Sequence, residues 1–152
     1  MASTDKAQAR KKGHGRQYAA MPLMTKDGQT QVLLVTSRET KRWVLPKGWA
    51  EDDLTPHELA AKEAYEEAGV TGDVVPEPIG TYHYQKKLEG GQIAACEVGV
   101  YPLWVKKQLK NWPERKERES QWFTFSQAAL VVDEGELVTL LLELAAQEDT
   151  AD

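Results

Sequence analysis

Residues Gly48–Val70 read GWAEDDLTPHELAAKEAYEEAGV, and the second half of this stretch predicts a helix with three carboxylates on one turn. Glu63, Glu66 and Glu67 are spaced i, i+3 and i+4, so in a helix that advances about 100° per residue they share one face. Like charges at this spacing repel one another unless a cation lies among them. Because oxygen-only ligands suit hard divalent ions, the cluster indicates a site for Mg²⁺ or Mn²⁺.

The ends of this helix are marked in the sequence. Thr55 and Glu58 form a Thr-x-x-Glu capping box, and Pro56 suits the first helical position. Gly69 is placed to end the helix in a left-handed conformation. A face of small residues predicts close packing of the helix on a sheet, and its members are Ala60, Ala61, Ala64 and Ala68.

Before this helix, the chain predicts strands and a hairpin. The apolar runs at 18–24 and 31–37 read as strands, and Asp27-Gly28 between them is a hairpin signal. A short strand is expected at 43–45, followed by a loop over 47–54.

After the helix, the chain predicts further strands and then helices. Runs at 79–87 and 92–105 read as long antiparallel strands, with Tyr82 and Tyr84 on one face, either in the core or lining a cleft. A charged loop over 106–120, a short strand at 121–125, a short helix capped by Ser126 and an amphipathic helix over 136–147 complete the list. This order predicts an α/β fold, a mixed β-sheet between helices in an α/β/α sandwich.

Composition limits the class of protein. The 152 residues fit one domain, 41% hydrophobic and 28% charged, which is typical of a globular protein. The net charge of −5 argues against general nucleic-acid binding. Residues 1–15 are basic and predict a disordered tail before a folded domain over 16–148; a collar that attracts a polyanionic substrate is the alternative interpretation.

The single cysteine, Cys96, excludes an internal disulfide and fits a reducing compartment. No apolar segment follows the basic start, so we expect no signal peptide, and no apolar run is long enough to span a membrane. A cytoplasmic location is therefore predicted, with no membrane partner. A homodimer is compatible with such a fold, but nothing in the sequence selects it.

The stretch at 48–70 resembles the signature of the Nudix hydrolases. Gly48 opens that signature, and KEAYEEAGV, residues 62–70, closes it at the required spacing. Two positions depart: Leu54 stands where the signature has Glu, and Lys62 where it has Arg. Lysine keeps the positive charge but loses the guanidinium fork, and Glu51 is a candidate to replace the missing Glu.

The resemblance implies a Nudix-type fold and roles for individual residues. Glu63 and Glu67 would be the main metal ligands, with Glu66 and the Gly48 carbonyl completing the site. The general base would be a signature Glu or a Glu from a distant loop, for which Glu119 is the candidate, with Glu117 behind it. The alternative for that segment is a charged loop without a catalytic role.

The segment LLVTSRETKRWVLPKGW, residues 33–49, is similar to the subgroup that acts on dinucleoside polyphosphates and diphosphoinositol polyphosphates. By that resemblance Arg38, Arg42 and Lys47 would contact substrate phosphates; ordinary surface cations are the alternative.

The leading hypothesis is a Mg²⁺-dependent pyrophosphohydrolase in which water attacks phosphorus of a small phosphoanhydride substrate. Leu54 and Lys62 leave open a catalytically weak, nucleotide-binding sensor. A hydrolase that removes damaged nucleoside triphosphates is the third hypothesis.

Overall fold

The computed structural model describes residues 14–150, in which the strands form one mixed sheet. The strands are β1 (His14–Lys26), β2 (Gln29–Thr36), β3 (Trp43–Val44), β4 (Lys47–Trp49), β5 (Val70–Val74), β6 (Gly80–Lys87), β7 (Ile93–Gln108) and β8 (Ser120–Thr124). The helical elements are α2 (Pro56–Glu63), the π-turn η1 (Ala64–Ala68), the 3₁₀ turn η2 (Glu89–Gly91), α3 (Phe125–Val131) and α4 (Gly135–Asp149). Of the tail expected over 1–15, residues 1–13 lie outside the described residues, and β1 begins at His14.

The long strands β1 and β7 form the centre of the sheet. They pair in parallel over ten residues, from His14 with Ala95 to Leu23 with Trp104. The path runs β3-β2-β1-β7-β5, while β4 pairs with β1, β6 with β7 and β8 with β2. All pairs other than β1 with β7 are antiparallel, so the prediction of a mixed sheet is confirmed.

The hairpin between β1 and β2 is also confirmed. Asp27 and Gly28 both have positive φ, at 53° and 77°, as a type I′ turn requires. Such a turn matches the right-handed twist of the two strands and fixes their register, in which Lys26 lies opposite Gln29.

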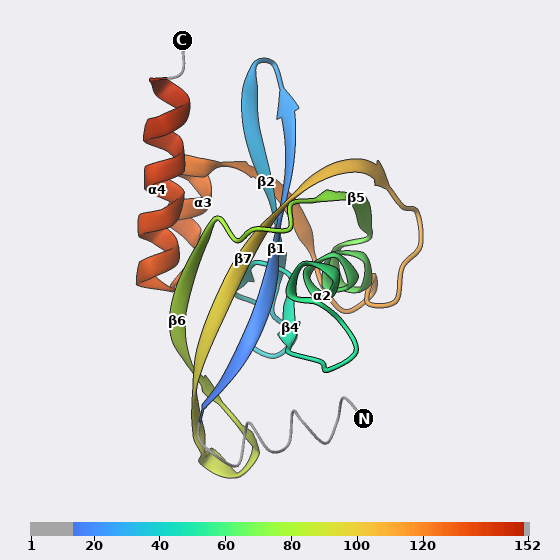
Figure 1. Cartoon of the computed structure of the whole chain (residues 1–152), viewed down its shortest axis with the longest axis vertical. Helices are drawn as coiled ribbons and strands as arrows, with labels where there is room; N and C mark the ends of the chain where they lie inside the picture. Colours follow the sequence, from blue (N-terminus) through green and yellow to red (C-terminus); the bar gives the residue numbers. More distant parts are fainter. Residues whose placement is uncertain (1–13, 151–152) are drawn as a thin grey trace.

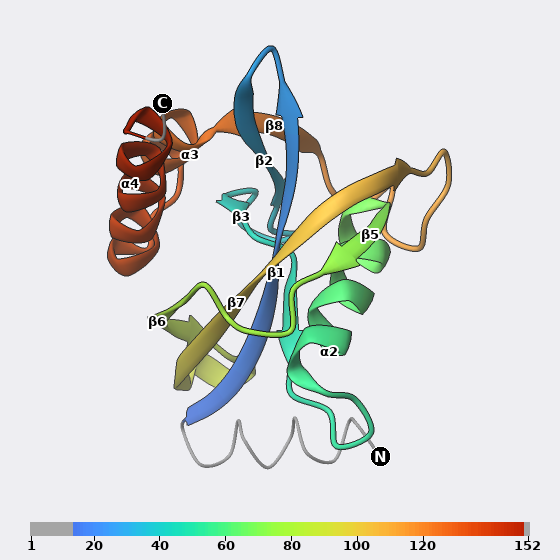
Figure 2. The same cartoon turned by 45° about the horizontal axis from the view of Figure 1, so that its top comes forward.

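Helices cover both faces of the sheet, which confirms the α/β/α arrangement. Figures 1 and 2 show α3 and α4 on one side and α2 on the other. The larger core lies beneath α3 and α4, where Phe125, Leu137 and Leu141 pack with sheet residues. The second core places the α2 alanines against Tyr101 and Leu103, and these small side chains let the helix approach the sheet closely. Within residues 14–150, no helix has the length and apolar character that crossing a membrane requires.

Both predicted ends of the signature helix are confirmed. The Thr55 hydroxyl accepts the Glu58 backbone N–H, and the Glu58 carboxylate accepts the Thr55 N–H at 2.9 Å. Gly69 ends the helical segment at φ 66°. Between these ends, however, the helix is not regular, because Ala64–Ala68 form a π-turn.

The sequence prediction was wrong in some details. The loop expected over 47–54 begins with strand β4, and β5 was not foreseen because Val70–Val74 reads VTGDV, without a clear alternation. Strand β7 continues to Gln108, so the first residues of the loop expected over 106–120 belong to that strand. Thr124 caps α3 in place of Ser126, since Gln127 completes a second capping box.

Alanine at Gly69 should destabilise the fold more than alanine at Gly28. Both glycines have positive φ, so a side chain costs about 1 kcal/mol of strain at either position. A Cβ at Gly69 would also lie 2.3 Å from the Trp112 ring, whereas nothing lies within 4 Å of one at Gly28. We therefore expect Gly69→Ala to lower the free energy of unfolding by at least about 1 kcal/mol more than Gly28→Ala, measured in urea. Equal losses would contradict the packing of Trp112 on this glycine.

Candidate active site

Two buried carboxylates meet where α2 passes into the π-turn. Glu63 and Glu67 are 8% and 6% exposed. Burial raises the pKa of Glu67 to about 9, and a hydrogen bond from the protonated Glu67 carboxyl to Glu63 adds to this, while the positive charge of Arg118 only partly opposes it. In the absence of a cation, Glu67 is therefore protonated at neutral pH and shares its proton with Glu63.

Gly48 lies directly behind this pair. Its pairing with Tyr18 in β1 holds the short strand β4 against the sheet. A Cβ on Gly48 would lie 2.5 Å from the Glu63 carboxyl carbon, so only glycine leaves room for that carboxylate. The neighbouring backbone N–H of Lys47 points to Glu67 Oε1 at 3.4 Å. The predicted ligands Gly48, Glu63 and Glu67 are thus brought together.

Glu66 differs from the pair in its burial. A π-turn rotates successive side chains by less than the α-helical 100°, so Glu67 stays over Glu63 while Glu66 falls further to the side. Over residues 14–150, no three acidic, histidine or cysteine side chains are already arranged as a metal cage. Glu66 is partly exposed, and its backbone carbonyl accepts the Glu114 N–H at 3.0 Å.

Glu51 pairs with Lys62, the position at which the signature has Arg. Lys62 Nζ lies 3.2 and 3.1 Å from the two oxygens of the Glu51 carboxylate, which is 7% exposed at its side chain. The lysine therefore keeps an acidic partner although the signature Glu is replaced by Leu54. This contact orients the helical turn that carries Glu63.

Arg118 was missed from the sequence, and it lies next to the carboxylate pair. Its side chain is 10% exposed, with Nη2 3.9 Å from Glu67 Oε1. It also donates to Glu114 at 2.8 Å and to the Thr36 carbonyl at 3.0 Å, so its guanidinium is fixed on three sides. The charged run at 114–119 indicated that a cation lies in this region. It did not indicate which of its cations turns inward.

Lys47 extends the site away from the carboxylates. Its ammonium nitrogen lies 5.3 Å from the centre of the Tyr84 ring. Burial lowers the pKa of Lys47, while the negative charges of Glu67 and Glu134 raise it. Both carboxylates therefore act on Lys47 electrostatically, and its contact with a substrate phosphate stays a prediction.

The two arginines predicted to contact phosphate are already paired with acids. Arg38 binds Glu117 at 3.1 Å on the surface, and this contact raises the pKa of the arginine. Arg42 lies 3.2 Å from Asp133 and 3.7 Å from Glu134, and no sequence pattern predicted these two acids here. A substrate phosphate would have to compete with these carboxylates for the two arginines.

The candidate base Glu119 is exposed and held by its backbone. Its N–H donates to Thr36 Oγ1 at 2.9 Å, and its carbonyl accepts the Thr36 N–H at 3.0 Å. Its role as the base stays a prediction.

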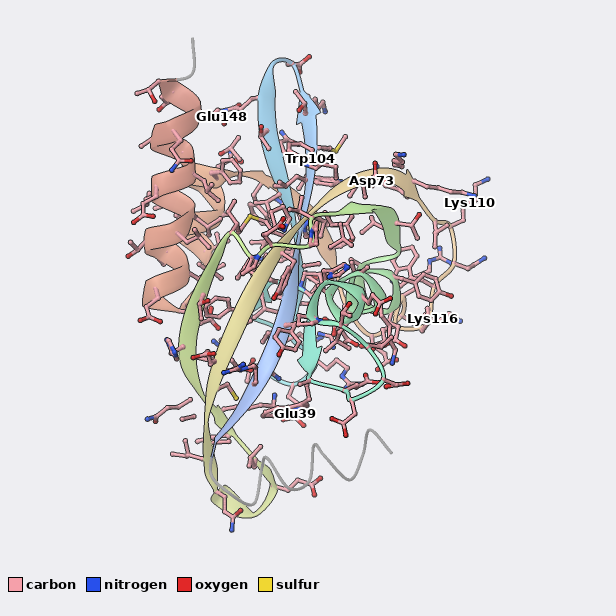
Figure 3. All side chains as sticks on the ribbon, in the orientation of Figure 1. Glu39, Asp73, Trp104, Lys110, Lys116 and Glu148 are labelled. Atoms are coloured by element: carbon pink, nitrogen blue, oxygen red, sulfur yellow. The ribbon has the colours of Figure 1, made fainter. Side chains whose placement is uncertain are left out.

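Further out on the same long connection between β7 and β8, Lys110 and Lys116 point away from the molecule, as Figure 3 shows. Glu117 is engaged by Arg38.

The donor set fits a hard divalent cation. Two buried carboxylates in contact, one of them protonated, form an arrangement that a cation relieves by replacing the shared proton. Glu63 and Glu67 would hold the metal, and the predicted participation of Glu66 stays a prediction. The single cysteine, Cys96, is buried and its thiol lies near the Ala94 carbonyl, and it is not part of this donor set.

Comparison with known proteins decides the family. The NUDIX domain model matches residues 15–141, most of the chain. The chain belongs to the Nudix family. The match begins one residue into β1 and ends in α4, so it takes in all of the sheet except His14, and it includes the carboxylate pair.

Similar proteins within the Nudix family come from plants and animals. Nudix hydrolase 12, mitochondrial, of Arabidopsis thaliana is 40% identical over 101 residues, which cover 64% of this chain and 50% of the relative. Diphosphoinositol polyphosphate phosphohydrolase 3-alpha of Homo sapiens is 31% identical over 120 residues, covering 77% of this chain and 69% of the relative. The chain spans about half the length of the Arabidopsis relatives Nudix hydrolases 12, 16 and 13.

Solved structures agree on the Nudix fold. The crystal structure of C. elegans Ap4A hydrolase superposes with a TM-score of 0.64 at 16% identity, covering 88% of this chain and 97% of that one. A NUDIX hydrolase from Nitrosomonas europaea gives 0.65 at 16% identity, covering 89% and 90%.

Mg²⁺ binding should release protons. Glu67 holds a proton at pH 7.5 because its pKa is about 9, and a metal ligand must be ionised, so binding expels about one proton. Calorimetric titration in two buffers with different ionisation enthalpies measures this number. We expect the release to fall toward zero as the pH rises through 9. Release that is absent at pH 7.5, despite binding, would contradict the shared proton.

Proposed function

We propose that this Nudix protein is a Mg²⁺-dependent pyrophosphohydrolase that splits a phosphoanhydride bond in a nucleoside-diphosphate-linked or polyphosphorylated substrate. The observation that supports this most is the buried contact between Glu63 and Glu67 beside Gly48. Such a contact is unfavourable in a protein with only a structural role, since neutral side chains would fill the same space without repulsion.

Hydrolysis of a phosphoanhydride is slow because its negative charge repels a nucleophile and increases on the departing phosphate. Glu63 and Glu67 would hold a divalent cation, which would supply charge neutralisation for the phosphates and lower the pKa of a bound water. The chain's own residues must therefore fix the ligands, bind the phosphates and accept a proton.

Each of these tasks has a candidate residue. Glu67 is held between the Lys47 N–H and the Arg118 guanidinium, which restricts the direction of its carboxylate. Burial lowers the pKa of Lys47, and the negative charge of a bound phosphate would favour its charged form, so Lys47 is the candidate for a phosphate contact. Glu119 remains the candidate for the base, since it adjoins Arg118 at the end of the charged run.

The substrate class rests on similarity. The human relative is named as a diphosphoinositol polyphosphate phosphohydrolase and the C. elegans structure is of an Ap4A hydrolase. Both names describe chains of phosphates attached to an organic group. We propose a small molecule of this kind as the partner and not a nucleic acid, because Arg38 and Arg42 are matched by acids and the net charge is −5.

A sensor without catalysis is the second candidate, motivated by Leu54 and Lys62. The contact of Lys62 with Glu51 weakens this argument, because it restores an ion pair next to the ligand turn. Tight binding of nucleotide without turnover would favour the sensor. The third hypothesis, a hydrolase of damaged nucleoside triphosphates, differs from the first in its product, which would be inorganic pyrophosphate.

Activity should require Glu67. With Mg²⁺, the purified protein should release phosphate or nucleotide from at least one member of a phosphoanhydride panel, identified by product mass. Glu67→Gln should reduce that rate at least about a hundredfold, because a ligand of the charge-neutralising cation is lost. The variant should still fold, since glutamine resembles the protonated carboxyl of the metal-free protein.

Glu77→Gln serves as the matched control, because this exposed residue in the β5–β6 connection should leave turnover unchanged. No turnover of any substrate by the wild-type protein, or full activity in Glu67→Gln, would refute the proposed function.

A further inference from the structure

Glu114, on the connection between β7 and β8, is linked in two ways to the ligand turn, residues 63–67. Its backbone N–H donates to the Glu66 carbonyl at 3.0 Å. Its carboxylate accepts a hydrogen bond from Arg118 Nε at 2.8 Å, and Nη2 of the same arginine lies 3.9 Å from Glu67 Oε1. Glu114 therefore contacts the backbone of the ligand turn directly, and one of its carboxylates through Arg118.

The connection is held against the end of the turn at further points. Figure 1 shows it curving past α2, and the Leu109 N–H donates to the Gly69 carbonyl at 2.8 Å. The Trp112 ring packs on Gly69, where a Cβ would lie 2.3 Å from it. Because these contacts fix the backbone of the connection, the place of the Arg118 guanidinium is decided by the partners of its own side chain.

The partners of Arg118 are not equally close. Its guanidinium lies 2.8 Å from Glu114 and 3.0 Å from the Thr36 carbonyl, but 3.9 Å from Glu67. A direct charge-assisted hydrogen bond between a guanidinium and a carboxylate measures about 2.7–2.9 Å. Arg118 therefore binds Glu114 directly and stops short of Glu67.

This separation matters for a metal ligand. The side chains of Arg118 and Glu67 are 10% and 6% exposed, so attraction between them is weakly screened by water. A guanidinium bound directly to Glu67 would occupy oxygens that a divalent cation needs. At 3.9 Å, Arg118 orients the carboxylate and leaves its oxygens to the cation. Without Glu114, the buried arginine would gain most by closing on Glu67.

We propose that Glu114 is a positioning residue, which holds Arg118 back from Glu67 and so keeps that carboxylate available to a divalent cation. The inference rests on the proposed function, because it concerns the metal site of that function. Glu114 acts through Arg118 and touches neither the metal nor the substrate.

The test measures binding of Mn²⁺ to the full chain without substrate, from the electron paramagnetic resonance signal of the unbound ion. Glu114→Ala should weaken binding at least about tenfold, because the released guanidinium competes for Glu67. Arg118→Met removes that competitor. It should therefore strengthen binding by a factor at least about fivefold larger in the Glu114→Ala background than in the wild type. Simple addition of charges predicts the same factor in both backgrounds.

Asp73→Ala is the matched control. It removes an acid from an exposed ion pair, 3.1 Å from Lys106, and changes the net charge by the same amount as Glu114→Ala. Because an exposed pair contributes little, Mn²⁺ affinity should stay within about twofold of the wild type.

A second measurement covers variants that fail to fold, which a thermal melt would show. If Arg118→Met unfolds, a metal-free crystal structure of Glu114→Ala should show Arg118 Nη2 about 3 Å from Glu67. If Glu114→Ala unfolds, Glu114→Gln, which keeps the length of the side chain, should weaken Mn²⁺ binding by a smaller factor. An unchanged distance in the first case, or unchanged affinity in the second, would overturn the proposal.

The possible failures are distinguishable. Unchanged Mn²⁺ binding in folded Glu114→Ala, or equal factors for Arg118→Met in the two backgrounds, overturns the role of Glu114 and leaves the proposed hydrolase intact. Absence of turnover on the whole phosphoanhydride panel overturns the proposed function, while the Mn²⁺ measurements, which need no substrate, still decide what Glu114 does. A wild-type protein that binds no Mn²⁺ overturns both.

Discussion

The contact between two buried carboxylates is the constraint on which the rest of this structure depends. Glu63 and Glu67 are held together in a place that water hardly reaches, and the pKa of Glu67 rises to about 9 as a result. A protein tolerates such a pair when a cation is to replace the shared proton. The surrounding residues therefore have to supply both the geometry and the compensating charge.

The fold supplies that geometry through a few close contacts. Strand β4 is held on β1, so Gly48 is presented to Glu63 without a side chain in between. The α2 alanines bring the helix close to the sheet, and the connection between β7 and β8 closes over its end through Trp112. Arg118 crosses from the end of β2 to Glu67, so one cation connects the sheet with the ligand turn.

The sequence predicted what depends on local spacing. The capping box at Thr55, the Gly69 end, the type I′ hairpin and the α/β/α order each follow from short-range patterns, and the structure confirms them. The π-turn could not be predicted, because it depends on how the turn packs. Arg118 and Glu134 also escaped notice, since a charged residue gives no local sign that tertiary packing will bury it.

Anomalous diffraction from crystals soaked in Mn²⁺ with a non-hydrolysable nucleotide tests the central claim most directly. We expect a strong manganese peak at Glu63 and Glu67, with the phosphates of the nucleotide next to it. A map without manganese at this turn, or with the metal bound elsewhere while the nucleotide occupies the protein, would contradict it.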